Sequence, residues 1–214
     1  MSSQASWIAV LVTIAIVMLY EAWFAYAQRR SPQKLARAAH ATLREDWFDA
    51  ISEQPGSEIL AVQTLRNSLM SASMVASTTV LGLMGAITLS ASSLAESFGA
   101  GEGMAGVFTP RLVAELVLMT LLFAALVASA MSVRYYNHVG FVGGMPVASE
   151  ARRRWHGVGR AHLRRAGVLY SWSVRNLVLV VPALAFILHP LAGPIAAVAV
   201  TLVLLSFDQV KVRD

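Results

Sequence analysis

The stretch AVQTLRNSLMSASM (residues 61–74) places an arginine and an asparagine inside one of the most apolar parts of the chain. It belongs to an apolar run from Ile59 to Leu89, so Arg66 and Asn67 would lie about 10 Å inside a membrane helix. A charge at that depth is costly. The same pair recurs in SWSVRNLVLVV (residues 171–181), as Arg175 and Asn176. The sequence therefore predicts membrane helices that carry two buried Arg-Asn pairs.

The composition places the chain among integral membrane proteins. Of its 214 residues, 57% are hydrophobic and 14% are charged, and the mean hydropathy is +0.60. Charged residues make up about a quarter of an ordinary soluble domain. The connections between the apolar runs are too short to form a separate soluble module. We therefore expect an all-α transmembrane helical bundle that forms a single membrane domain over residues 1–214.

Apolar runs long enough to cross a membrane define the expected spans. A helix needs about 20 apolar residues to cross about 30 Å of hydrocarbon. Thr109 and Pro110 form an N-cap and first-turn pair, so the third run should begin there. The last run is shorter and follows the turn HPLAGP (residues 189–194), so it is either a fifth span or a re-entrant segment. The expected spans lie near residues 7–27, 59–90, 110–135, 168–188 and 191–207.

The distribution of positive charge predicts the orientation of the bundle. Lysine and arginine are concentrated in residues 28–58 and 136–167, which we expect to be cytoplasmic loops. The segment AESFGAGEGMAGVFTP (residues 95–110), between the second and third spans, has two glutamates and no lysine or arginine, as an external loop should. We therefore expect the N-terminus outside and, with five spans, the C-terminus in the cytoplasm.

The segment SPQKLARAAHATLREDWFDAI (residues 31–51) has the periodicity of an amphipathic helix. Apolar residues recur on one side of this helix, and Lys34, Arg37 and Arg44 lie on the other. Two interpretations are open. The segment is a basic helix on the inner membrane surface, or it is a solvated helix within the loop.

Polar residues from several spans are predicted to lie at similar depths and to form one polar layer. On the second span, five polar residues spaced by three, four or seven share one helix face. An ionisable residue within a span is a functional-site hypothesis. The candidate site residues are Glu21, Gln63, Arg66, Asn67, Ser73, Ser77, Trp172, Arg175 and Asn176.

This polar layer has two interpretations. In the structural one, Glu21 pairs with Arg66 and Asp208 pairs with Arg175, and these ion pairs fix the register of the helices. In the functional one, Arg66, Arg134 and Arg175 outnumber the two carboxylates. The layer is then net positive and suits an anion, a phosphate or a lipid headgroup.

Other kinds of chemistry have little support in the sequence. There is no hydrolase elbow, phosphate-binding glycine loop or nucleophile with its base, so we predict no catalytic residue and no enzyme. No histidine lies within an expected span and the chain has no cysteine, so we expect no haem, metal site or other cofactor. The net charge of +5 comes from residues beside the apolar runs, which suits anionic headgroups and not nucleic acid.

Four segments carry a resemblance to a known family: LREDWFDAI (43–51), LAVQTLRNSLMSASMVAST (60–78), RYYNHVGFVGGMP (134–146) and RAGVLYSWSVRNLVLVVPAL (165–184). Together they resemble the domain-of-unknown-function-599 family of bacterial and plant integral membrane proteins. The resemblance covers most of the chain from Tyr20 onward and implies a multi-span helical membrane protein, but no activity. It places these residues on family motif positions: Gln63, Arg66, Asn67, Trp172, Ser173 and Arg175.

From these features we expect a small multi-pass channel or transporter of the bacterial inner membrane. Arg66 and Arg175 would attract a small ion or anionic substrate, and Ser73 and Ser77 would continue the pathway outward. The small residues of the second span favour a homo-oligomer, and the basic loops favour contact with anionic lipid headgroups. Two other functions stay open: a non-transporting assembly or accessory protein, and an enzyme acting on a lipid phosphate.

Overall fold

The computed structural model describes residues 3–30, 36–98 and 108–208, and in these ranges the chain is almost entirely helical, with no strand. This confirms the predicted all-α class. The described residues form six helices: α1 (Ser3–Arg30), α2 (Ala36–Glu53), α3 (Glu58–Phe98), α4 (Pro110–Gly143), α5 (Glu150–Leu188) and α6 (Ala192–Asp208).

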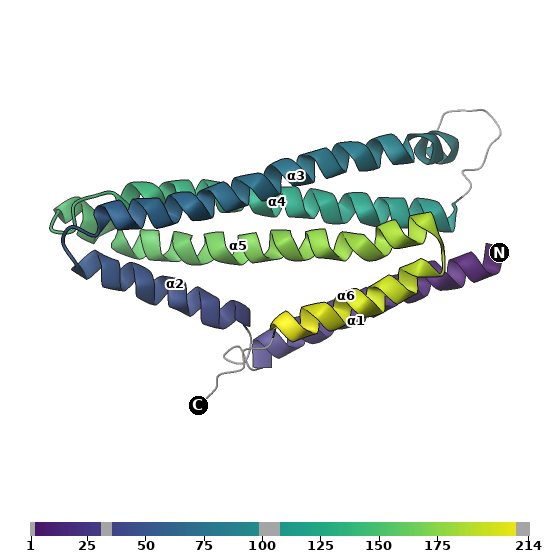
Figure 1. The fold of residues 1–214 in the computed structure, drawn as a ribbon, viewed down its shortest axis with the longest axis horizontal. Helices are drawn as coiled ribbons and strands as arrows, with labels where there is room; N and C mark the ends of the chain where they lie inside the picture. Colours follow the sequence, from purple (N-terminus) through teal and green to yellow (C-terminus); the bar gives the residue numbers. More distant parts are fainter. Residues whose placement is uncertain (1–2, 31–35, 99–107, 209–214) are drawn as a thin grey trace.

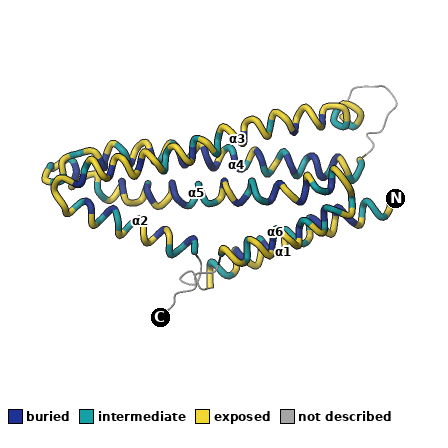
Figure 2. Tube along the Cα trace, in the orientation of Figure 1, coloured by how far each residue is buried: buried dark blue, intermediate teal, exposed yellow. Residues whose placement is uncertain are grey.

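The helices form two groups that meet at a shallow angle (Figure 1). The long helices α3 and α5 run in the same direction and α4 runs antiparallel to both, in contact with each of them. The helices α1 and α6 form an inclined pair, and α2 runs from the end of α1 towards the start of α3. Because α3 packs mainly on α4, most of its surface is uncovered (Figure 2).

Four of these helices, α1, α3, α4 and α5, are long and apolar enough to cross a membrane. The helix α6 is apolar but has 17 residues, which span about 25 Å. It returns beside α5 and packs against α1. The start of α4 is as predicted, because the Thr109 hydroxyl accepts a hydrogen bond from the Leu112 amide at 3.1 Å and Pro110 opens the first turn. The inside and outside positions of the termini stay a prediction.

The helices continue well beyond the predicted spans, so most of residues 28–58 and 136–167 are helical and not open loops. The polar side chains there pair between helices: Arg160 Nε lies 3.2 Å from Asp49 Oδ2, and Arg164 Nη1 lies 3.3 Å from Glu45 Oε1. We call this region the polar end of the bundle. It consists of α2 and residues 58–66, 136–143 and 150–165.

The helix α2 packs against α5, which favours the loop-helix interpretation of this segment. Phe48 and Ile51 are buried in one hydrophobic cluster with Leu163. Arg152 is also buried, with its guanidinium carbon 5.0 Å from the Phe48 ring centre. Gly159 permits this close approach, because a Cβ at that position would lie 2.9 Å from Phe48 Cζ. The apolar side of α2 therefore covers protein and not lipid.

A pair of histidines at the polar end should make stability depend on pH. The rings of His138 and His162 lie 5.8 Å apart, and Tyr135 lies 5.1 Å from His162. Burial, together with His138 and Arg165, lowers the pKa of His162 below its usual value. The unfolded chain therefore binds this proton at a higher pH than the folded chain does. Stability from this group is present above about pH 6.5 and is lost as the pH falls through the lowered pKa.

We therefore expect the Tm in detergent to fall between pH 7.5 and pH 5.5, and to fall less in the His162→Gln variant. His40→Gln, at an exposed position on α2, is the matched control and should keep the full pH dependence. An equal fall in Tm for wild type and His162→Gln would contradict the assignment.

Candidate functional site

The structure places the two Arg-Asn pairs at different depths in the bundle. A Cβ at Gly143 of α4 would lie 3.0 Å from Leu65, the neighbour of Arg66. Ser173 precedes Arg175 by two residues on α5, and its hydroxyl donates to the carbonyl oxygen of Ala125 on α4 at 2.8 Å. Arg66 therefore lies near the level of Gly143, and Arg175 lies near the level of Ala125. Since Gly143 follows Ala125 by 18 residues on α4, these two levels differ by about 27 Å. The prediction of a single polar layer is therefore wrong.

Arg66 lies at the polar end, on an exposed face of α3. The apolar run of α4 stops at Arg134, nine residues before the level of Gly143. The prediction counted the span from Ile59, but α3 is longer than a membrane is thick, and its residues 69–90 alone cover about 33 Å. Within the described ranges, Arg66 has no hydrogen-bond or ion-pair partner, so the predicted Glu21–Arg66 pair is wrong.

The other predicted residues of α3 also lie away from Arg175. Gln63, Asn67 and Ser77 are exposed and Ser73 is half-buried. Asn176 is half-buried beside Arg175 in the chain, without a side-chain hydrogen bond to any described residue. Of the predicted residues, the structure therefore brings Arg175, Glu21 and Trp172 together, and it leaves the α3 residues outside this group.

Arg175 lies at the centre of a buried group of charges. Its side chain is only 4% exposed, with Nε 2.7 Å from Glu21 Oε1 on α1 and Nη1 2.8 Å from Asp208 Oδ2 on α6. The Tyr20 hydroxyl donates to the same Asp208 oxygen. The predicted ion pair of Asp208 with Arg175 is confirmed, and Arg175 forms a second ion pair with Glu21.

A second arginine, Arg37 at the start of α2, completes this group. Its guanidinium carbon lies 4.6 Å from the Phe24 ring centre and 4.5 Å from that of Trp172. The Arg175 guanidinium carbon lies 4.0 Å from the same Phe24 ring and 4.8 Å from that of Tyr20. Aromatic rings and guanidinium groups thus alternate through the group, which favours both cations. We call these residues the ionic cluster: Tyr20, Glu21, Phe24, Arg37, Trp172, Arg175 and Asp208.

The ionic cluster is balanced in formal charge, with two arginines and two carboxylates. Arg37 is only 8% exposed, although the sequence predicted it on the open basic side of its helix. No described carboxylate forms an ion pair with Arg37. An unpaired buried charge is costly, so the nearby carboxylates of Glu21 and Asp208 are what offset both guanidinium groups.

Three buried guanidinium nitrogens of the ionic cluster lack a hydrogen-bond partner among the described residues. They are Nε and Nη1 of Arg37 and Nη2 of Arg175. Most buried polar groups in proteins are hydrogen-bonded, so unused donors on two neighbouring arginines need an explanation. Guanidinium donors match the oxygens of carboxylates and phosphates. Arg37 and Arg175 therefore carry the free donors that an anion-binding site uses.

No group of three or more histidine, aspartate or glutamate side chains in the described residues could hold a metal ion. The model of a family described as protein of unknown function, DUF599, matches residues 8–212 of the chain. No curated protein matches the chain, and no solved structure does. The match covers nearly the whole sequence, including all the residues of the ionic cluster. The chain therefore belongs to the DUF599 family, and it carries the apolar helices of a membrane protein.

Proposed function

We propose that this protein is a small transporter of the bacterial inner membrane that binds an anion at Arg37 and Arg175. The observation that carries the proposal is the set of three buried guanidinium nitrogens without partners, on two arginines that share one aromatic ring. In this proposal the anion binds Arg175 together with Arg37, whereas the sequence predicted a site at Arg175 and Arg66. Its work is binding and release, and no catalytic step is part of it.

The charge balance of the ionic cluster suggests how an anion would be held and released. An arriving carboxylate or phosphate takes the free donors and then competes with Glu21 and Asp208 for Arg175, because all three bind the same guanidinium group. A site that exchanges partners in this way binds an anion without leaving a permanent unpaired charge in the membrane.

Pro182 supports a moving helix next to this site. It lies inside α5, seven residues after Arg175. Proline has no N–H, so the carbonyl group of Val178 loses its usual helical partner, and the helix can bend there. Interrupted helices beside a buried site are common in transporters. Since Arg175 is almost fully buried, a movement of this kind would be needed to open the site.

The proposal includes contacts of the protein with its surroundings. The uncovered face of α3 carries polar and small residues, including Ser77 and Thr78, and we propose that a second copy of the chain covers it. Exposed arginines of the polar end, including Arg153 and Arg165, would contact anionic headgroups.

Anion flux into liposomes that contain the purified protein tests the proposal. The Arg37→Gln variant removes the charge and most free donors while leaving Glu21, Arg175 and Asp208 in place. We expect it to lose at least about tenfold in flux of the preferred anion, which corresponds to one lost charge-assisted hydrogen bond. Arg66→Gln is the matched control, because it removes an exposed arginine that touches no described partner, and it should keep the wild-type flux.

Two results would contradict the proposal. The first is an absence of flux and binding for every carboxylate and phosphate tested with folded wild-type protein. The second is equal flux in Arg37→Gln and wild type. Either result would leave the ionic cluster as a structural lock in an assembly or accessory protein.

A further inference from the structure

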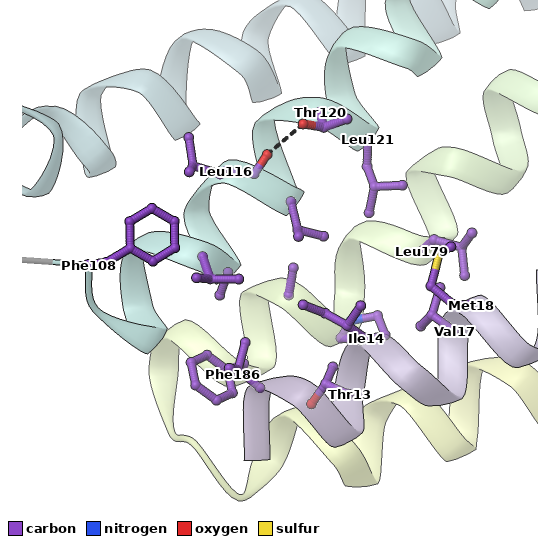
Figure 3. Close-up of a pocket in the computed structure, with 16 residues that line it drawn as sticks. Thr13, Ile14, Val17, Met18, Phe108, Leu116, Thr120, Leu121, Leu179 and Phe186 are labelled. Carbon is purple, nitrogen blue, oxygen red and sulfur yellow. Dashed lines mark hydrogen bonds between the residues drawn. The ribbon is translucent and has the colours of Figure 1, made fainter. Parts of the chain in front are cut away.

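An apolar groove lies between α1, α4 and α5, with a cavity volume of about 390 Å³ (Figure 3). The residues around it are almost all aliphatic or aromatic. Figure 3 shows Phe108 and Phe186 at one end and Val17, Met18 and Leu179 at the other. The groove lies within the apolar parts of three helices that can cross a membrane, so hydrocarbon is the medium around it.

The groove exists because α1 is held against the long helices at two separate places. Near the start of α1, Val10 packs with Ala114 and Phe186 in a small hydrophobic cluster. Near its other end, Glu21 binds Arg175. Between these two contacts α1 stands away from α4 and α5. Apolar voids lower stability in proportion to their volume, so a hydrocarbon chain in this groove is favoured.

One end of the groove lies about one helical turn from the ionic cluster along α1 and α5, and no residue of the cluster lines it. Leu179 follows Arg175 by four residues on α5, and Val17 precedes Glu21 by four residues on α1. Each interval is one helical turn, or about 6 Å. The free Nη2 of Arg175 therefore lies about one turn beyond the apolar lining. An anionic head at the ionic cluster and an apolar tail in the groove would belong to one molecule.

We infer that the substrate is a single-chain amphipathic anion, with its carboxylate or phosphate on Arg37 and Arg175 and its hydrocarbon tail in the groove. The inference rests on the proposed function and adds its substrate class. The groove follows α5 from Leu179 to Phe186, seven residues or about 10 Å. At about 1.2 Å per bond of an extended chain, the groove holds about eight carbons, and the turn of about 6 Å between Leu179 and the head at Arg175 takes about five more.

Binding of straight-chain carboxylates from acetate to hexadecanoate tests this inference. The protein is placed in lipid nanodiscs, and affinity is measured from the ligand-dependent shift in Tm. Affinity should change little up to about five carbons, and each further methylene should tighten binding about fourfold until the tail fills the groove at about thirteen carbons, after which affinity should level off. Primary alcohols of the same lengths measure what partitioning into the lipid contributes.

Two matched variants separate the groove from the rest of the surface. Thr120 lies at an exposed position beside the groove and its hydroxyl donates to the Leu116 carbonyl at 2.8 Å. Thr88 on α3 is also exposed, with the same kind of bond to the Met84 carbonyl at 3.0 Å. Thr120→Phe fills the groove and should abolish the gain in affinity with chain length, whereas Thr88→Phe should keep it.

Each outcome of this experiment decides one question. Equal affinity for acetate and octanoate would overturn the amphipathic substrate and leave an anion site. A chain-length gain that survives in Thr120→Phe would overturn the groove as the place of the tail. No binding of any carboxylate would overturn both the inference and the proposed function. If affinity rose with chain length but no flux were seen, the site for an amphipathic anion would stand and the transport function would be overturned.

Discussion

Replacing Arg175 with alanine should lower the free energy of unfolding by about 3 to 5 kcal/mol. The substitution leaves Glu21 and Asp208 largely buried and without the cation that both of them bind. It also removes the guanidinium group from the Phe24 and Tyr20 rings. Thermal and denaturant unfolding of the detergent-purified protein, followed by circular dichroism, measures the effect.

Two variants make this result specific. Arg66→Ala removes an exposed arginine and should change stability by no more than about 0.5 kcal/mol. The quadruple variant Glu21→Gln, Arg37→Met, Arg175→Met and Asp208→Asn removes all four charges of the ionic cluster together and should recover most of the lost stability, because no unpaired charge stays buried. Equal stability of Arg175→Ala and Arg66→Ala would contradict the central place of Arg175.

Replacing Phe48 with alanine should cost about 3 to 5 kcal/mol, as is usual for a fully buried aromatic residue. Phe48 connects α2 to α5: its ring lies under the Arg152 guanidinium group, stacks on His156 at 5.4 Å and faces Gly159. We expect the loss to be greatest at the polar end. Hydrogen exchange of the α2 amides should rise more than that of the α4 amides.

Phe141→Ala is the matched control for Phe48→Ala. Phe141 is also at the polar end, but its side chain is 74% exposed, so little packing is lost with it. Its removal should leave both the Tm and the exchange of α2 nearly unchanged. If Phe48→Ala behaved in the same way, the packing of α2 on α5 would be wrong.

Hydropathy was enough to predict the class of the fold and the positions of the long helices. A run of apolar residues must be helical to satisfy its backbone in lipid, so the four longest runs correspond to α1, α3, α4 and α5. Capping chemistry is equally local, and Thr109 with Pro110 marked the start of α4. The pair of Asp208 with Arg175 was predictable because both are rare charges beside apolar runs, and each needs a partner.

The depth of Arg66 and the burial of Arg37 could not be predicted in this way. Apolar residues surround Arg66 on both sides, because Ala61 and Leu65 pack on α4 beyond the end of its apolar run. Hydropathy does not distinguish apolar residues that face protein from those that face lipid. Arg37 follows a basic pattern along its own helix, and only the approach of α1 and α5 covers it. Such contacts depend on how distant segments pack.

The position of Phe24 beneath two guanidinium groups has a thermodynamic consequence. One of these groups belongs to α2, and the other belongs to α5, a helix long and apolar enough to cross a membrane. A ligand that changes the surroundings of Arg175 must therefore alter the free energy of α2 as well. By reciprocity, a partner that binds α2 would change the affinity of the ionic cluster for such a ligand by the same factor by which the ligand changes the affinity of α2 for that partner. Occupancy of the ionic cluster would then be detectable as a change in how the exposed side of α2 binds its partner.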